Sequence, residues 1–257
     1  MTDNCGTGSL SYTQPAKYDV RASPLLYPWL SMHFDIHHAH RWDVSSREAV
    51  AIQRDLAGRV RHESLSSSVE TIAGIDVSIR GDLAQAAIVV LRFPALEVVD
   101  RAVWRAEVPF PYVPGLLSFR EMPIILPALE RLSAPPDVLV TDSHGLAHPR
   151  RFGLACHLGV LLDRPAFGVA KSLFVGTFED PAPEKGSRAA LVDKKTGEVL
   201  GTVLRTRANV KPVYVSVGHR ITLEEAVGLT LACAPRYKIP EPTRRAHLLS
   251  RDSDFGF

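Results

Sequence analysis

The sequence predicts an α/β protein with one mixed sheet, in which three antiparallel strands precede parallel strands and helices flank the sheet. Three strand-like runs joined by short gaps occupy residues 70–108, and the short gaps favour an antiparallel meander. A strand–helix–strand order follows over residues 137–172, which is typical of parallel neighbours. Hydrophobic residues make up 46% of the 257 residues, so the chain can bury a sizeable core.

Charge and cysteine content exclude several classes of protein. The formal net charge is only +2, so any basic patch for nucleic acid must be local. Cys5, Cys156 and Cys233 are widely spaced and odd in number, which excludes a disulfide framework and a CxxC metal pair. No run reaches the roughly 18 apolar residues of a membrane span, and the N-terminus lacks a signal-peptide layout. We therefore expect a cytoplasmic, soluble monomer that does not bind membranes.

Residues 1–41 differ from the rest and are expected to form a flexible leader, because they are rich in polar residues and proline and show no regular period. Four histidines crowd at the end of this segment, namely His33, His37, His38 and His40. Histidines three and four residues apart can share a helix face and bind a metal. We favour the alternative, a polar surface segment, because short His-rich tracts are often only compositional.

The main domain is expected over residues 42–235, and it begins with an amphipathic helix. Asp43 or Ser45 is the expected N-cap, and apolar residues then recur at helical spacing, at Ala49, Ile52, Leu56 and Val60. The three runs of the meander follow this helix, at residues 70–80, 84–93 and 96–108.

Prolines complicate the next helix, which we expect within residues 122–132. Pro123 suits a first turn, whereas Pro127 does not suit a helix interior, so either the helix starts elsewhere or it is kinked. The alternating part then gives a strand, a helix and a strand, at residues 137–142, 151–163 and 166–172.

The last third of the domain predicts more strands and one helix. The strands are expected at residues 189–193, 198–205 and 212–217. Thr222 and Glu225 have the spacing of a capping box at the start of the helix. This order of elements is that of ribonuclease H-like domains. The segment after Pro235, residues 236–257, reads as a basic and weakly structured tail.

Two aspartates at strands indicate a metal site. Asp76 lies in an otherwise apolar strand, although the alternation alone leaves open whether it faces solvent. Asp142 ends another apolar strand, and ligands gather outside the carboxyl ends of strands in open α/β sheets. If the two strands are neighbours, the two carboxylates can face each other across one metal. Such a pair suits Mg²⁺, with Mn²⁺ as a substitute, and Glu121 can complete a second site or hold the attacking water.

The sequence resembles endonuclease V, the deoxyinosine-directed nuclease of the ribonuclease H-like superfamily, over residues 42–235. PYVPG followed by LSFRE is distinctive on its own. The matching stretches occur in the order of the family: AGIDVS (73–78), PYVPGLLSFRE (111–121), DSHGLAHPRRFGLACHLGV (142–160), GVAKSLFVG (168–176) and VSVGHRI (215–221).

The resemblance implies roles for individual residues. Asp76 and Asp142 correspond to metal-binding aspartates, and Glu121 to a third catalytic acid that also belongs to the metal site. Lys171 and His219 correspond to basic residues that assist catalysis, where a strand-end cation can hold a phosphate oxygen.

The resemblance also implies a lesion-reading loop and a base pocket. Tyr112, on a proline-stiffened loop, would wedge between bases when the damaged base leaves the stack. His148 would order the pocket. Arg150 and Arg151 would contact backbone phosphates. The other pocket positions are Gly115, Leu117, Gly145, Gly153 and Leu154. Ser143 departs from the family, which mostly has glycine there; serine either strains or crowds the pocket or adds a hydroxyl contact.

The function that this resemblance implies is a metal-dependent endodeoxyribonuclease of DNA repair. It would recognise a deaminated purine, inosine or hypoxanthine, in DNA. It would hydrolyse the second phosphodiester 3′ of the lesion, leaving 3′-hydroxyl and 5′-phosphate ends. Two alternatives stay open. One is a ribonuclease H-like nuclease for inosine-containing RNA or branched DNA. The other is a catalytically weak module that only binds deaminated bases.

Overall fold

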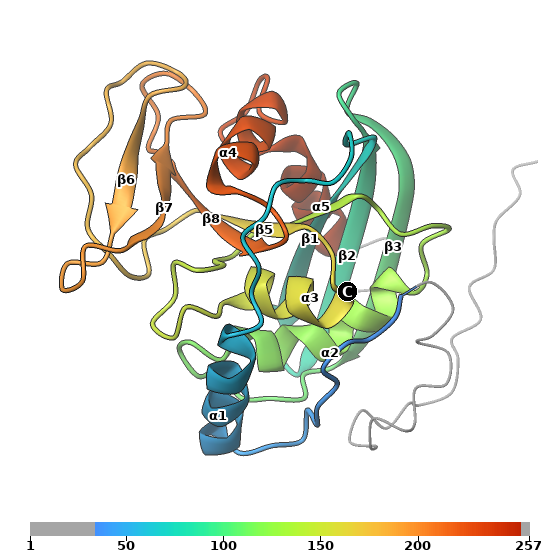
Figure 1. The fold of residues 1–257 in the computed structure, drawn as a ribbon. Helices are drawn as coiled ribbons and strands as arrows, with labels where there is room; N and C mark the ends of the chain where they lie inside the picture. The colour runs from blue at the N-terminus through green and yellow to red at the C-terminus, as the bar shows by residue number, and fades with distance from the viewer. Residues whose placement is uncertain (1–33, 253–257) are drawn as a thin grey trace, which may run out of the picture.

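The computed structural model describes residues 34–252, and Figure 1 shows one sheet with helices on both of its faces. His33 and most of the expected leader lie outside the described residues. The sheet has eight strands in the order β3-β2-β1-β4-β5-β8-β7-β6. The strands are β1 (Thr71–Arg80), β2 (Leu83–Arg92), β3 (Glu97–Glu107), β4 (Val138–Thr141), β5 (Ala166–Ala170), β6 (Arg188–Val192), β7 (Val199–Leu204) and β8 (Val213–His219). The helices are α1 (Ser46–Ala57), α2 (Leu117–Leu129), α3 (Leu154–Leu162), α4 (Leu223–Ala232) and α5 (Glu241–Ser250).

The strand directions confirm the predicted mixed sheet. Strands β1, β2 and β3 form the antiparallel meander, while β4 lies parallel to both β1 and β5. Strands β8, β7 and β6 continue the sheet antiparallel from β5. Because β4 and β5 run the same way, they end at one edge, at Thr141 and Ala170, which we call the carboxyl edge. They begin at the opposite edge, at Val138 and Ala166, which we call the amino edge.

Alternate residues of β1 face two different apolar layers, so both faces of the strand are covered. Ala73 and Ile75 pack in the core cluster that contains residues of α2 and α3. Ile72 packs in the cluster that contains residues of α4 and α5. Asp76 shares the face of Ile72 because side chains alternate along a strand. The aspartate therefore points toward the layer of α5 rather than into open solvent.

Helix α2 begins five residues earlier than the sequence indicates, and it contains both prolines. A proline inside a helix removes a backbone hydrogen bond and costs about 3 kcal/mol or more. Nearly all residues of α2 are buried, including Pro123 and Pro127 themselves. Burial of a large apolar side chain contributes about 1.5–3 kcal/mol, so packing on the sheet offsets the lost bonds.

The prediction of a weakly structured tail is wrong for residues 241–250, which form α5 across β1 and β2. Gly74 makes this close approach possible, since a Cβ at that position would lie 2.0 Å from the carbonyl carbon of Pro242. The side-chain amide of Gln85 donates to the carbonyl oxygens of Leu249 (3.0 Å) and Ser250 (3.1 Å), which satisfies two groups at the end of the helix.

Residues 34–41 also differ from the flexible leader that their composition indicates, because they pack against α3. Phe34 is buried, and the backbone N–H of His37 donates to the carbonyl oxygen of Leu161 at 2.7 Å. His40 shares a hydrogen bond of 2.7 Å with the buried His157 through their Nε2 atoms. The described histidines of this segment join no group of three or more potential metal ligands.

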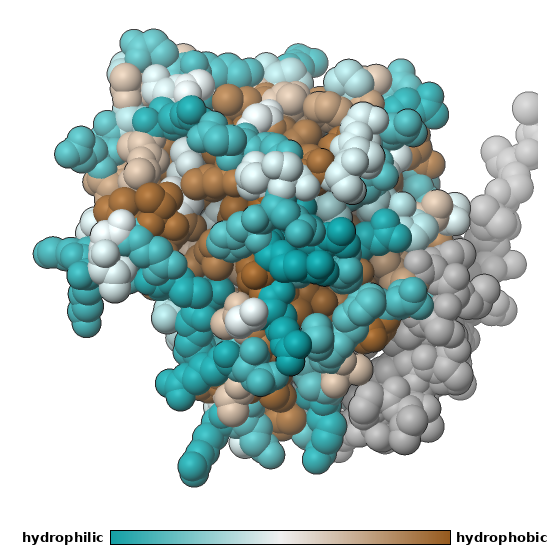
Figure 2. Space-filling model, viewed as in Figure 1, coloured by the Kyte–Doolittle hydropathy of each residue, from teal (hydrophilic) through white to brown (hydrophobic). Residues whose placement is uncertain are grey.

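Of the two expected N-caps of α1, Ser45 is the one that the structure shows, and it forms a capping box with Glu48. The predicted capping box of Thr222 and Glu225 is present at the start of α4. Among residues 34–252, no helix combines the length and the apolar character that crossing a bilayer requires. Figure 2 shows that hydrophilic residues cover much of one face of the molecule, with smaller apolar groups between them.

Candidate active site

The structure places Asp76 and Asp142 side by side at the carboxyl edge. Ile75 of β1 pairs with Thr141 of β4, so the residues that follow them are neighbours. The backbone N–H of Asp142 donates to the carbonyl oxygen of Ile75 at 3.4 Å. The side chains of both aspartates are only 11% exposed. Two nearly buried carboxylates in this position repel each other unless a positive charge lies between or beside them.

Helix α5 adds a histidine to this pair, which the sequence pattern did not predict. Nδ1 of His247 donates to Oδ2 of Asp76 at 3.3 Å, and the Ser250 hydroxyl donates to the same oxygen at 2.6 Å. Asp76, Asp142 and His247 each offer one potential metal-ligand atom, and these three atoms all lie within 4.8 Å of one another. The missed signal was Pro242 at the start of a segment whose small residues Thr243, Ala246 and Ser250 recur at helical spacing.

Glu121, near the start of α2, faces the same cluster without joining the group of three. Burial raises the pKa of Glu121 to about 8, and the charges of Asp76 and Asp142 add to the rise. Three acids thus share one partly buried site with few cations to neutralise them. A divalent cation would supply the missing positive charge, and carboxylate oxygens are the ligands that Mg²⁺ prefers. The residues present therefore fit a metal ion.

Lys171 follows the end of β5 and forms an ion pair with Asp142. Burial raises the pKa of the Asp142 carboxyl, and the Lys171 ammonium counteracts part of that rise. The structure thus brings together four of the five catalytic residues that the resemblance implied, from three strands and a helix.

The structure does not bring His219 to this site, and the catalytic role that the resemblance implied for it is not supported. His219 pairs with Ala166, the first residue of β5, and so lies at the amino edge. Its Nδ1 accepts from the backbone N–H of Arg61 at 3.2 Å, and its Nε2 lies 3.0 Å from a carboxylate oxygen of Asp163. Both ring nitrogens are occupied by structural partners.

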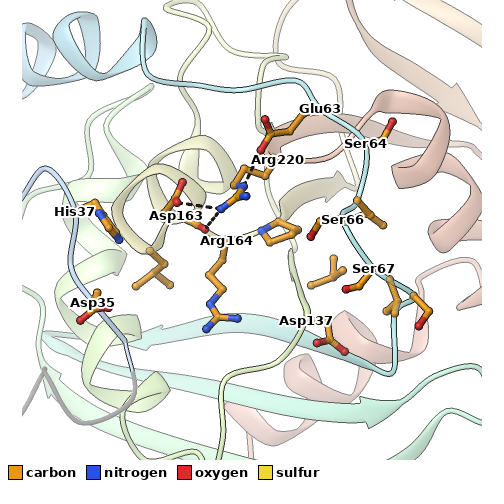
Figure 3. A pocket seen from close by; sticks show the side chains of 16 residues that line it. Asp35, His37, Glu63, Ser64, Ser66, Ser67, Asp137, Asp163, Arg164 and Arg220 are labelled. Carbon is orange, nitrogen blue, oxygen red and sulfur yellow. Dashed lines mark hydrogen bonds and ion pairs between the residues drawn. The ribbon is translucent and has the colours of Figure 1, made fainter.

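A polar pocket of about 350 Å³ marks this amino edge (Figure 3). Arg220 donates there to Asp163 (3.0 Å) and to Glu63 (2.7 Å), so these charges are paired within the protein. The pocket lining includes Asp137 and Val138 at the start of β4, but none of the acids of the carboxyl edge. The pocket is therefore separate from the candidate active site.

The loop that carries Tyr112, residues 109–115, projects from the protein and is fixed at its base; we call it the wedge loop. Tyr112 is 72% exposed. Gly115 has a φ of +81°, which favours glycine. Its carbonyl oxygen accepts from side chains of Gln53 (3.0 Å), His148 (3.0 Å) and Arg150 (2.6 Å). Three hydrogen-bond donors on one carbonyl oxygen hold the loop in a defined position, while the Tyr112 side chain remains exposed to solvent.

Arg150 and Arg151 bind protein groups, which weakens their expected role as phosphate contacts. Arg150 donates to the Gln53 side chain at 2.6 Å as well as to the wedge loop. Arg151 forms ion pairs with Asp193 (2.6 Å) and Glu198 (2.8 Å). We infer that both guanidinium groups position the loops around the expected base pocket.

Two of the remaining residues expected in the base pocket, Gly145 and Gly153, close a loop before α3, residues 145–153, which we call the closed loop. The backbone N–H of Gly153 donates to the carbonyl oxygen of Gly145 at 3.0 Å. A Cβ at Gly145 would lie 2.0 Å from the Val217 oxygen, and one at Gly153 would lie 2.2 Å from the His144 oxygen. Both glycines are therefore required by close backbone packing. Leu154 is buried at the start of α3, and Leu117 is half-buried at the start of α2.

Ser143 fits the fold without backbone strain. It is not among the residues with positive φ, and its side chain is buried. Its hydroxyl shares a hydrogen bond of 2.7 Å with the hydroxyl of Thr141. The expectation that serine strains the backbone at this position is therefore wrong. The Ser143 hydroxyl already forms a hydrogen bond within the protein.

The mixed sheet and the acids at its carboxyl edge define a nuclease of the ribonuclease H-like class. A family model for endonuclease V matches residues 54–248. An endonuclease V from Roseiflexus sp. (strain RS-1) is 52% identical, over 81% of this chain and 93% of that protein. The crystal structure of endonuclease V from Streptomyces avermitilis is 48% identical, with a TM-score of 0.77, over 82% of this chain and 93% of that one. That of Ciona intestinalis endonuclease V is 29% identical, with a TM-score of 0.70, over 80% and 95%. The chain belongs to the endonuclease V family, and it is an endonuclease.

Proposed function

We propose that the chain cuts DNA beside a deaminated purine, at the second phosphodiester 3′ of inosine, and leaves 3′-hydroxyl and 5′-phosphate ends. The observation that carries this proposal is the group of Asp76, Asp142 and His247, with Glu121 beside it, at the carboxyl edge. The endonuclease V of Ciona intestinalis forms a complex with a 24mer DNA that contains an inosine followed by a ribo-adenosine. That complex supports an inosine-containing nucleic acid as the substrate class.

Mg²⁺ is the metal that we propose, with Mn²⁺ as a substitute. Asp76 and Asp142 would hold it through carboxylate oxygens, and the imidazole of His247 would contact a water ligand of the ion. When bound, the ion would lower the pKa of a coordinated water and offset the charge of the phosphate. The hydrogen bond from Ser250 holds the Asp76 carboxylate in one orientation, as partners of metal ligands do.

The protein groups around the metal site have separate tasks. The Lys171 ammonium, beside Asp142, can stabilise the charge that develops on a phosphate oxygen in the transition state. The carboxyl of Glu121 can orient the attacking water or pass a proton to the departing oxygen. The Lys171 side chain is 42% exposed, so a phosphate oxygen can reach its ammonium group from solvent.

Recognition of the lesion is assigned to the wedge loop and to the closed loop before α3. The exposed ring of Tyr112 can fill the gap that the damaged base leaves in the duplex. Hypoxanthine offers an oxygen acceptor and a ring N–H donor, and a glycine-containing backbone can approach both. His148 links the two loops through Gly115. A mispaired inosine lowers the cost of moving the base out of the stack.

A nicking assay tests the proposal. Duplex DNA with one inosine should be cut only when Mg²⁺ or Mn²⁺ is added, and the product length should place the cut at the second bond. Matched RNA, branched DNA and undamaged DNA are assayed in parallel, because faster cutting of one of them would change the substrate. Lesion binding without any nicking would instead show a binding module. The monomeric state and the cytoplasmic location stay predictions from the sequence.

A further inference from the structure

Lys211 lies at the carboxyl edge next to the proposed active site, although it takes no part in that site. It precedes β8 by two residues, and Tyr214 of β8 pairs with Ala170, the last residue of β5. Lys171 follows Ala170 directly. Lys211 and Lys171 therefore flank the ends of two neighbouring strands.

Lys238 reaches the same edge from the connection between α4 and α5. The Thr206 hydroxyl donates to the carbonyl oxygen of Lys238 at 2.6 Å. Thr206 follows β7, whose last residue, Leu204, pairs with Val213 of β8 at the carboxyl edge. Burial lowers the pKa of Lys238, and the charges of Lys211 and Lys171 lower it further. Three ammonium groups from three separate segments thus lie near one another.

Within the described part of the chain, two of these three cations have no carboxylate partner. Lys171 pairs with Asp142, but neither Lys211 nor Lys238 forms an ion pair with any residue between 34 and 252. The neighbouring Arg244 and Arg245, by contrast, are both paired with Glu241. Like charges held together without counter-charges destabilise the folded protein, and an anion bound between them would remove that cost.

We propose that Lys211 and Lys238 form a phosphate-binding track, along which the backbone of the cleaved nucleic acid runs as it leaves the metal site. The proposal rests on the proposed nuclease function and adds a surface to it. Because the ammonium groups contact phosphates, the track would read no bases and would set affinity and position rather than lesion preference. The separation of tasks follows from the geometry: Tyr112 and the closed loop read the base, and the two lysines hold the strand.

The salt dependence of binding tests this track directly. Affinity for a fluorescent inosine duplex is measured in EDTA, so that no cleavage occurs, at a series of salt concentrations. Each lost phosphate contact should reduce the slope of log K against log [salt] by about one. The double variant Lys211→Ala/Lys238→Ala should therefore reduce the slope by about two and weaken binding on the order of ten-fold at 0.1 M salt. Lys211→Arg/Lys238→Arg should keep the slope of the unmodified protein.

The matched control removes two cations at the amino edge that form no ion pair within residues 34–252. Arg92 pairs with Thr71 at the start of β1, and Arg164 lines the pocket of Figure 3. Arg92→Ala/Arg164→Ala changes the net charge by the same amount and should leave the slope unchanged. Equal slopes for both double variants would overturn the track, because net charge would then explain the effect. If the unmodified protein nicks inosine DNA while Lys211→Ala/Lys238→Ala keeps its slope, only the track fails. If the unmodified protein does not bind inosine DNA, both proposals fail.

Discussion

The hydroxyl of Ser250 in α5 donates a 2.6 Å hydrogen bond to Oδ2 of Asp76 in β1, across 174 positions of the sequence. His247, one turn earlier, donates to the same oxygen. The last helix therefore completes the acid cluster that begins in the first strand. Removal or loosening of α5 would release both donors from the carboxylate at once.

Ser250→Ala should weaken metal binding without unfolding the protein. Partners that orient a metal ligand typically change metal affinity 10–100-fold, and we expect the lower end because Asp76 keeps the bond from His247. Titration of Mn²⁺ by calorimetry measures the effect. Leu248→Ala is the matched control, because Leu248 lies in the same helix but is 58% exposed. An unchanged Mn²⁺ affinity in Ser250→Ala would show that the hydroxyl does not orient the site.

Asp142→Ala should abolish cleavage and leave lesion binding largely intact. The substitution removes a carboxylate of the proposed metal group and the partner of Lys171, but it leaves the residues proposed to read the base unchanged. Nicking and anisotropy on the same inosine duplex separate the two effects. Glu70→Ala, an exposed acid just before β1 at the amino edge, is the control. Appreciable nicking by Asp142→Ala would remove Asp142 from the metal site.

Tyr112→Ala should reduce discrimination between inosine and undamaged DNA more than it reduces stability. The ring is 72% exposed, so little packing is lost, while the opened duplex loses its wedge. We expect roughly a ten-fold loss, in line with about 1–3 kcal/mol for stacking of a base on an aromatic ring. Tyr112→Phe keeps the ring and should retain selectivity. Equal selectivity in the unmodified protein, Tyr112→Ala and Tyr112→Phe would exclude a wedge role for Tyr112.

Stability should fall as the pH drops below about 6.5, because several buried histidines are held neutral. Burial lowers the pKa of His148 to about 4 and that of His157 well below its usual value. A histidine whose pKa is lowered in the folded state contributes stability above its unfolded pKa, and this is lost as the pH falls through the interval between the two values. One such histidine accounts for about 2 kcal/mol between pH 6.5 and 5.

Urea unfolding at pH 7 and pH 5 measures this loss. His157→Phe keeps a ring beside Trp42, Phe119 and Phe152, and it removes one titrating group. The variant should therefore lose less stability on acidification than the unmodified protein, even if its stability at pH 7 is lower. An identical loss in both proteins would mean that His157 does not take up a proton on unfolding.

The local sequence pattern was sufficient to predict the strands and to place two of the acids. Period-two alternation and short gaps predicted β1, β2 and β3, and apolar runs that end in polar residues predicted Asp142 at the end of β4. Pattern was less reliable for α2, because the rule against interior prolines describes an isolated helix. In the protein, burial of nearly the whole helix on the sheet outweighs that rule.

The sequence by itself determined which segments form strands, the placement of Asp76 and Asp142 at strands and the resemblance to the family, because these depend on residues close together in the chain. The tertiary structure decided which residues contact one another across the chain. It placed α5 on Gly74 and so brought His247 to Asp76, it put His219 at the amino edge, and it turned Arg151 toward Asp193. Small residues such as Thr243 and Ala246 carry the packing of α5, and they give no strong hydrophobic period. Contacts across more than a hundred positions depend on how whole elements pack, and no local period encodes that.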